Sequence, residues 1–175
     1  MPIKSRIRTV PHYPKTGVMF RDITTLLKDP TGLQLAVKSI ADHFRGQPID
    51  RVAGIEARGF ILGAAVAYEL GLGFIPVRKK GKLPAEVVGQ DYALEYGTDR
   101  IEIHTDAIAP EESILLIDDL IATGGTAAAA CALIQSMGGN VQGCGFVIDL
   151  PDLGGRQLLE QLGHSVFALC EFEGD

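Results

Sequence analysis

Two adjacent carboxylates and a glycine-threonine stretch lie close together in the sequence and could act on one ligand. Residues 114–126 read ILLIDDLIATGGT, in which Asp118 and Asp119 follow an apolar run. Carboxylates repel phosphate, whereas the backbone N–H groups of a glycine turn at a helix N-terminus attract it. Neutral vicinal hydroxyls can donate hydrogen bonds to carboxylates, and a bound Mg²⁺ can also bridge carboxylate and sugar oxygens. This stretch therefore predicts a site for a ribose that carries a 5-phosphate.

The plain structural interpretation of this stretch is the end of a strand followed by a capped helix. Either the aspartate pair or the Thr-Gly-Gly-Thr turn alone favours that interpretation, but their order after an apolar strand favours a binding site. Two rival phosphate motifs are absent: the sequence has no G-x-x-x-x-G-K-[ST] and no G-x-G-x-x-G that opens a helix. Adjacent strand residues point to opposite faces, so both carboxylates reach one ligand only if the chain is already turning.

The apolar patterns along the chain alternate between those of strands and those of helices. They predict strands over 51–55, 73–77, 101–104, 114–117, 141–150 and 166–172, helices over 33–44, 59–70, 125–137 and 155–162, and an irregular loop over 78–91. Pro76 indicates an edge or strand-end position for its strand. Such alternation predicts a single α/β domain with a mostly parallel sheet flanked by helices. Ligands of this architecture bind beyond the carboxyl ends of the strands.

The composition limits the classes of function. The chain has 175 residues, is 46% hydrophobic and carries a formal net charge of -6, which argues against non-specific nucleic-acid binding. The sequence has no apolar run of the ~18 residues that a membrane span needs, and its N-terminal stretch lacks the apolar core of a secretory signal. We therefore expect a cytoplasmic protein without membrane contact. Cys131, Cys144 and Cys170 are widely spaced, so we expect them to pack in the core.

The stretch ILLIDDLIATGGT closely resembles the phosphoribosyl pyrophosphate (PRPP) motif of the type I phosphoribosyltransferases. The stretches YPKTGVMFRDITTLL, GIEARGFILG and GKLP…YALEYGTDRIEIH resemble the adenine phosphoribosyltransferases, in the same order along nearly the whole chain. The resemblance implies one type I phosphoribosyltransferase domain over 1–175, with an N-terminal base-recognition hood over 1–32 and a flexible catalytic lid over 79–93. It also implies a homodimer and a purine-salvage reaction that uses Mg²⁺ and joins adenine to PRPP, giving AMP and pyrophosphate.

The resemblance assigns PRPP-binding residues by position. The ribose hydroxyls would be held by Asp118 and Asp119, and the 5-phosphate by Ala122, Thr123, Gly124, Gly125 and Thr126. The pyrophosphate would be bound by Glu56, Ala57, Arg58 and Gly59, together with Arg78, Lys79 and Lys82 from a basic run. Within that run we expect Lys79 and Lys82 to contact the pyrophosphate, although any single lysine there fits a solvated run of charges equally well. The family often has a non-proline cis peptide where this chain has Glu56–Ala57, and Mg²⁺ would be held mainly by PRPP oxygens and water.

The resemblance also implies how the base is bound and protonated. Phe20 would stack on adenine, with backbone groups around Met19 and Arg21 reading the ring edge; the family commonly has Val at the position of Met19. An isolated aromatic residue more often packs in a core, so this assignment rests on the resemblance. Glu95 would donate a proton to adenine N7 as N9 attacks, and Tyr96 beside it would belong to the lid. The transition state would be oxocarbenium-like, with its positive charge near the aspartates.

Two other functions fit parts of the same pattern. A regulatory module would keep the PRPP site but lose the base site and lid, whereas Phe20, Arg21 and the LEYG stretch are all present. A transferase for a 6-oxo purine such as hypoxanthine would need hydrogen-bond donors at position 6 rather than an acceptor. We prefer adenine transfer over both.

Overall fold

The main sheet of the protein has seven strands in the order β5-β6-β4-β3-β7-β8-β9. The structure is a computed structural model and describes residues 2–94 and 96–174. The parallel strands are β3 (Arg51–Ile55), β4 (Gly73–Lys79), β7 (Ser113–Ile121), β8 (Asn140–Asp149) and β9 (Val166–Glu171), and the antiparallel ones are β5 (Val87–Ala93) and β6 (Thr98–His104). The predicted α/β fold with a mostly parallel sheet is confirmed.

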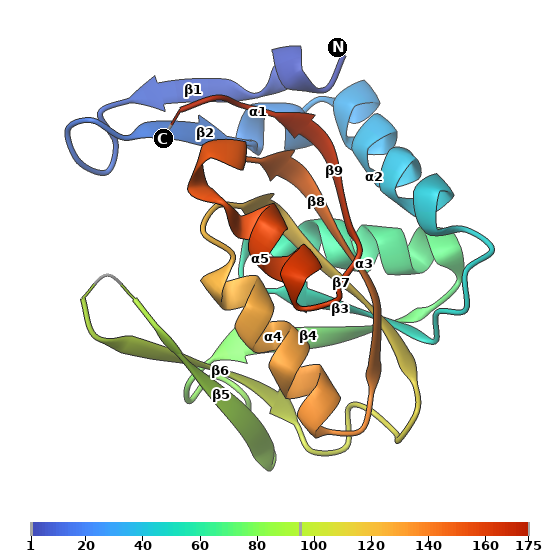
Figure 1. The fold of residues 1–175 in the computed structure, drawn as a ribbon. Helices are drawn as coiled ribbons and strands as arrows, with labels where there is room; N and C mark the ends of the chain where they lie inside the picture. The colour runs from blue at the N-terminus through green and yellow to red at the C-terminus, as the bar shows by residue number, and fades with distance from the viewer. Residues whose placement is uncertain (1, 95, 175) are drawn as a thin grey trace.

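Helices cover both faces of this sheet, as Figure 1 shows. One face packs against α2 (Pro30–Phe44) and α3 (Arg58–Leu70), and the other against α4 (Gly125–Ser136) and α5 (Gly155–Gln161). The central strand β7 is buried by both layers, because Leu115 and Ile117 pack with α2 and α3 while Ile114 and Leu116 pack toward α4. All four of these side chains are fully buried. The continuous apolar run 114–117 therefore has the environment predicted for it.

The N-terminal residues form a small second sheet, which we call the hood hairpin. It consists of β1 (Arg8–Pro11) and β2 (Met19–Asp22), which pair antiparallel, and it is flanked by η1 (Lys4–Arg6) and α1 (Thr24–Leu27). The C-terminal end of the chain returns to it, because the Arg21 guanidinium lies 4.6 Å from the Phe172 ring centroid and donates to the carbonyl of Glu173. The hood hairpin and the β5–β6 hairpin project from the same side of the molecule (Figure 1).

Two sequence predictions about this fold are wrong in part. The loop predicted over 78–91 includes the end of β4 and most of β5, which pairs with β6 along its whole length. This edge strand is only partly buried, so its sequence shows no apolar alternation. Pro76 does not lie in an edge strand, because β4 runs between β3 and β6. The pairing of β4 with β6 begins only at Arg78, so it spares the position of the proline.

The prediction that the three cysteines pack in the core agrees with the structure, because Cys131, Cys144 and Cys170 are free thiols in the interior. Across the residues that the structure describes, no helix has both the length and the apolar character required to span a membrane.

The direction of the strand order changes between β3 and β7. The chain passes from β3 to β4 on one side, and later places β7 on the other side of β3, followed by β8 and β9. The segments that leave the carboxyl ends of β3 and β7 therefore diverge. In open α/β sheets such a switch point leaves a crevice in which ligands bind, and it is here that Arg58 and residues 122–126 lie.

We expect the central position of β7 to dominate stability. Leu116→Ala removes a fully buried side chain and should lower the free energy of unfolding by about 2–5 kcal/mol, measured by urea denaturation. The same change at Leu162, which is 54% exposed, is the matched control and should cost no more than about 0.5 kcal/mol. Equal losses in the two variants would contradict the burial of β7.

Candidate functional site

A pocket of about 270 Å³ opens at the carboxyl ends of β3 and β7. It collects segments that are distant in the sequence: the start of α3, the end of β7, the turn into α4, and single residues of β4, β5 and β6. The sequence-predicted residues that line it are Glu56, Arg58, Lys79, Asp118, Asp119, Ala122, Thr123, Gly124, Gly125 and Thr126. Sequence reasoning missed the remaining lining residues, which are Ile55, Tyr92, Ile101, Leu120, Ile121 and Ala127.

The two aspartates of the pocket lie within β7 rather than beyond its end, because the strand continues to Ile121. Both nevertheless line the same pocket. Asp119 is 5% exposed and accepts a 2.5 Å hydrogen bond from Arg58 Nε. Asp118 Oδ1 accepts from the backbone N–H of Asp119 at 2.8 Å.

These contacts set the charges of the pocket. Burial and the neighbouring charge of Asp119 raise the pKa of the Asp118 carboxyl well above its usual value. Burial alone would lower the pKa of the Arg58 guanidinium, but the charge of Asp119 and its hydrogen bond raise it. Arg58 is therefore firmly cationic, and the carboxylate pair suits a ligand that supplies hydrogen-bond donors or positive charge.

Residues 122–126, which we call the glycine loop, connect β7 to α4. Gly124 has φ = 86°, a left-handed conformation that glycine adopts without strain. The helix begins at Gly125, so the first N–H groups of α4 have no carbonyl partner within the helix. Thr123 is exposed and Thr126 partly buried at the same turn. The loop offers backbone and hydroxyl donors, together with the positive end of a helix dipole, to an anion.

The turn between β3 and α3 approaches the aspartates closely. The Glu56–Ala57 peptide bond is cis, which agrees with the resemblance. A Cβ atom at Gly59 would lie 2.8 Å from Asp118 Oδ1, so a side chain there would collide with the carboxylate. The Glu56 carboxylate turns toward β4 and accepts from the backbone N–H of Lys79 at 2.5 Å.

The basic run contributes one side chain to the pocket. Lys79 lines it and its ammonium lies 3.0 Å from Asp99 Oδ2, a hydrogen bond that raises the pKa of the lysine. Arg78 and Lys82 are not among the lining residues: the Arg78 guanidinium lies 5.9 Å from the Phe60 ring centroid, and Lys82 is exposed. The structure thus brings Lys79, but neither Arg78 nor Lys82, to the aspartates and the glycine loop.

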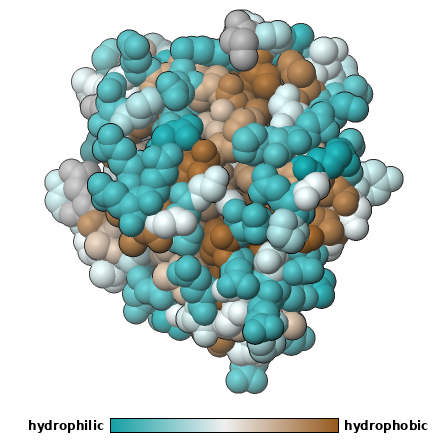
Figure 2. Space-filling view, turned by 45° about the vertical axis from the view of Figure 1, so that its right-hand side comes forward, coloured by the Kyte–Doolittle hydropathy of each residue, from teal (hydrophilic) through white to brown (hydrophobic). Residues whose placement is uncertain are grey.

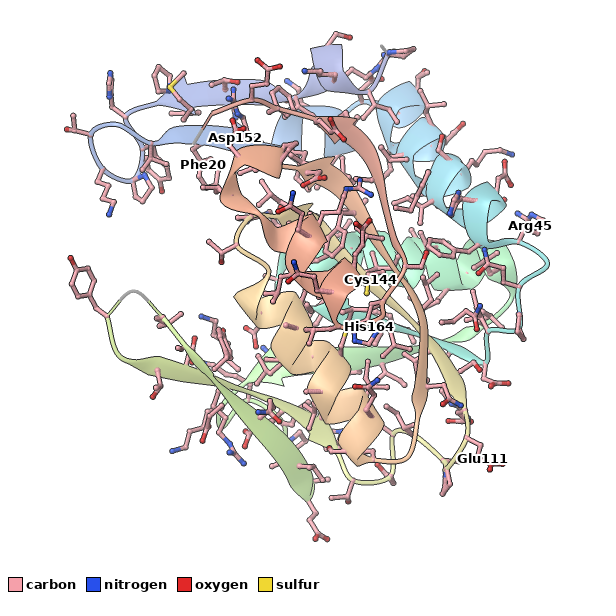
Figure 3. All side chains as sticks on the ribbon, viewed as in Figure 1. Phe20, Arg45, Glu111, Cys144, Asp152 and His164 are labelled. Carbon is pink, nitrogen blue, oxygen red and sulfur yellow. The ribbon has the colours of Figure 1, made fainter. Side chains whose placement is uncertain are left out.

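The hood hairpin presents Phe20 to the same end of the sheet. Its ring centroid lies 5.7 Å from the Arg58 guanidinium and 5.2 Å from the Tyr13 ring, which it meets edge to face. Phe20, Tyr13, Val10 and Asp22 line a second pocket of about 260 Å³. Figure 3 labels Phe20, whose side chain leaves β2 on the side that faces the main sheet. Arg58 therefore lies between this aromatic pocket and the aspartates.

The other two residues predicted for base recognition differ in their surroundings. Arg21 donates to Thr9 Oγ1 at 2.7 Å and lies over Phe172, so its side chain is engaged away from the pockets. Met19 is 36% exposed. Only backbone groups of these two residues were predicted to contact a base, and that prediction stays open.

The β5–β6 hairpin reaches the glycine loop. The Ala93 carbonyl oxygen lies 4.0 Å from the position of a Cβ atom at Gly125. Tyr96 is 85% exposed and Leu94 48% exposed. Glu95, the predicted proton donor, lies outside the described residues.

The side chains of the pocket do not form a complete metal cage. Among residues 2–94 and 96–174, no group of three or more His, Cys, Asp or Glu side chains could hold a metal ion. The pocket has two adjacent carboxylates, and one is already occupied by Arg58. These residues fit a metal ion that takes most of its ligands from a bound substrate and water.

Comparisons with known proteins agree with this geometry. The phosphoribosyl transferase domain family matches residues 22–157. The adenine phosphoribosyltransferase of Nitrosospira multiformis is 68% identical over the whole of both chains. A crystal structure of adenine phosphoribosyltransferase from Thermoanaerobacter pseudethanolicus superposes with a TM-score of 0.94 at 45% identity, covering 98% of each chain. The crystal structure of adenine phosphoribosyltransferase from Saccharomyces cerevisiae, complexed with an imino-altritol bisphosphate and adenine, superposes with a TM-score of 0.91 at 37% identity and covers 97% of each chain.

The family match covers most of the chain, a relative matches it over its full length, and a solved structure shares its fold over 98% of each chain. The carboxylate pair, the glycine loop and Arg58 lie together as the motif order predicts. The chain therefore belongs to the phosphoribosyltransferase family, and within it to the adenine phosphoribosyltransferases.

Proposed function

We propose that this chain transfers the 5-phosphoribosyl group of PRPP to adenine, producing AMP and pyrophosphate. The observation that carries the proposal is the single pocket in which two carboxylates, a glycine loop and Arg58 meet. The relative from Saccharomyces cerevisiae, whose structure holds adenine and a bisphosphate, supports the same choice of substrates.

The sugar phosphate spans the aspartates and the glycine loop. The ribose hydroxyls donate to Asp118 and Asp119, while Ala122, Thr123, Gly124, Gly125 and Thr126 bind the 5-phosphate. Burial and the charge of Asp119 raise the pKa of the Asp118 carboxyl, and hydrogen bonds from two ribose hydroxyls would favour its charged form. This arrangement binds the phosphate at the helix terminus and keeps it apart from the carboxylates.

The pyrophosphate lies toward the turn after β3. Arg58 and the backbone of Glu56, Ala57 and Gly59 contact it, and Lys79 adds positive charge from β4. Lys79 supports this role better than Arg78 or Lys82, because it alone of the three lines the pocket. A bound Mg²⁺ would supply further positive charge to the leaving group. It would be held mainly by PRPP oxygens and water, and of the pocket's side chains the Asp118 and Asp119 carboxylates would suit it.

Adenine occupies the space between the hood hairpin and Arg58. Phe20 stacks on the ring, and backbone groups around Met19 and Arg21 read its edge. The Arg58 guanidinium lies 5.7 Å from the Phe20 ring centroid, so a base held by Phe20 would be a neighbour of the cation proposed for the leaving group. In the transfer, C1 of the ribose loses pyrophosphate and forms a bond with adenine N9, while the carboxylates stabilise the oxocarbenium-like transition state.

The lid (79–93, with Tyr96 and Glu95 beyond it) excludes water from the oxocarbenium-like species and brings Glu95 to adenine N7. The approach of Ala93 to the glycine loop supports a lid that closes over this end of the pocket.

We also propose that the enzyme works in the cytoplasm as a homodimer. Ile61 and Tyr68 on α3, which are 49% and 89% exposed, offer apolar area to a partner. Figure 2 shows apolar patches separated by hydrophilic residues on one face of the monomer.

The choice of base is tested by supplying PRPP and Mg²⁺ with adenine, hypoxanthine, guanine or xanthine in separate assays and following nucleotide formation spectroscopically. We expect AMP from adenine and no product from the 6-oxo purines, because their position 6 presents an acceptor where adenine presents a donor. Turnover of hypoxanthine in place of adenine would overturn the proposal.

The role of Glu95 is tested by Glu95→Gln, which keeps the shape of the side chain and removes its acid. We expect kcat to fall by about a hundredfold, within the usual range for loss of an acid or base, with little change in KM for adenine. Glu86→Gln is the control, because it changes an exposed carboxylate of the same segment. An unchanged kcat in Glu95→Gln would exclude it as the proton donor.

We expect Asp118 to lower the free energy of unfolding at pH 8, because its carboxyl is buried beside Asp119, although the same carboxyl is needed to bind PRPP. Asp118→Asn keeps an oxygen for the Asp119 N–H and should raise Tm at pH 8 by about 2–4 °C, the shift that about 1 kcal/mol gives in a domain of this size. Turnover should fall strongly in the same variant.

The sign of the pH dependence follows from the raised pKa of Asp118. Between the usual aspartate pKa and the raised one, the folded protein binds a proton that the unfolded chain has released. The free energy of unfolding of the wild type therefore falls as pH rises through this window, and Asp118→Asn should lack that fall. Parallel pH profiles of Tm in the two proteins would contradict the proposed repulsion.

A further inference from the structure

The glycine loop rests directly on the first residue of α5. Gly155 is buried, and its backbone N–H donates to the Ala122 carbonyl at 2.9 Å. The contact is reciprocal, because a Cβ atom at Gly124 would lie 2.9 Å from Gly155 Cα. Two backbones thus touch without any side chain between them, and the hydrogen bond fixes their relative position.

A side chain at position 155 would move the glycine loop. A Cβ atom there would lie 2.8 Å from the Gly124 backbone nitrogen and 2.7 Å from Ile121 Cγ1, and it would also collide with the Ala122 carbonyl oxygen. Two of these three neighbours are backbone atoms of the loop itself, so no side-chain rotation removes the collision. Either the loop or α5 must shift.

The start of α5 is itself held firmly. Arg156 Nε donates to Asp149 Oδ2 at 2.7 Å, and Arg156 Nη1 donates to the Val166 carbonyl at 3.0 Å. Asp149 is fully buried at the end of β8, and Val166 begins β9. The adjacent residue Leu150 donates its backbone N–H to the carbonyl of Ile121 at 3.0 Å. Arg156 therefore ties α5 to two strands, next to the residue that supports the loop.

From these contacts we propose that Gly155 is a positioning residue for the 5-phosphate. It fixes the distance between the glycine loop and α5, and Arg156 holds α5 in place. The proposal rests on the proposed function of the loop as the 5-phosphate site. Gly155 lies outside the lining of the pocket and acts through Ala122 and Gly124. Displacement of the loop weakens the binding of ligands that carry the 5-phosphate and leaves the adenine site unaffected.

The test is Gly155→Ala, with Gly73→Ala as matched control. Gly73 begins β4 at the opposite end of the strands, and the nearest atom to an added Cβ is the flexible guanidinium of Arg51, 3.3 Å away. We expect KM for PRPP to rise about tenfold or more in Gly155→Ala, because a misplacement of about 1 Å can cost up to about a hundredfold. KM for adenine should stay within about twofold of wild type. Loss of correctly folded enzyme alone would lower kcat and leave both KM values unchanged.

A binding measurement separates this proposal from the proposed function. Calorimetric titration with ribose 5-phosphate should show binding to the wild type and to Gly73→Ala, and weaker binding to Gly155→Ala by the same factor as KM. If the wild type binds ribose 5-phosphate but forms no AMP, the proposed function fails and the role of Gly155 is still tested. A folded Gly155→Ala with unchanged KM for PRPP and unchanged affinity for ribose 5-phosphate would overturn the positioning role.

If Gly155→Ala fails to fold, the variant Arg156→Lys tests the positioning role instead. Lysine keeps a positive charge beside buried Asp149 but cannot donate to both Asp149 and the Val166 carbonyl as the guanidinium does. We expect a rise of about threefold to tenfold in KM for PRPP, with KM for adenine unchanged. An unchanged KM for PRPP would then overturn the proposal.

Discussion

The ion pair between Arg58 and Asp119 is the contact on which the pocket depends. It joins the start of α3 to the central strand β7, and the same guanidinium lies over Phe20 of the hood hairpin. One cation thereby touches the elements proposed for the leaving group, the sugar and the base. Asp118 lacks an equivalent ion pair in the described residues, and burial together with the charge of Asp119 raises the pKa of its carboxyl. We expect a ligand with hydroxyl donors to stabilise the Asp118 carboxylate, which Arg58 does not bind.

The sheet topology makes this contact possible. β3 and β7 are neighbours, and the chain leaves them toward opposite sides of the sheet, so the turns that follow them face one crevice. Glycines allow the close approaches at this crevice: Gly59 meets the carboxylate of Asp118, and Gly124 meets Gly155. A strand buried on both faces supports the whole arrangement, because β7 carries both aspartates and leads into the glycine loop.

The sequence predicted well what depends on near neighbours. The apolar run 114–117 and the glycine turn before α4 are local features, and each lies where the pattern indicated. The strand itself is longer than predicted, because β7 continues through both aspartates to Ile121. Strand β5 was missed, because a partly buried edge strand has no apolar period, whereas the predicted strand 101–104 lies within β6. The bond from Lys79 to Asp99 and the contact of Gly155 with the loop join residues far apart in the sequence, so only tertiary structure reveals them.

We propose that the carboxylate pair binds the ribose hydroxyls while the glycine loop binds the phosphate. A double-mutant cycle between protein and ligand tests this arrangement, with ribose 5-phosphate and its 2,3-dideoxy analogue titrated into the wild type and into a protein carrying Asp118→Asn and Asp119→Asn. We expect removal of the hydroxyls to weaken binding to the wild type about tenfold or more, as loss of charge-assisted hydrogen bonds does, and to change binding to the variant little. The same loss in both proteins would show that the carboxylates do not bind the ribose hydroxyls.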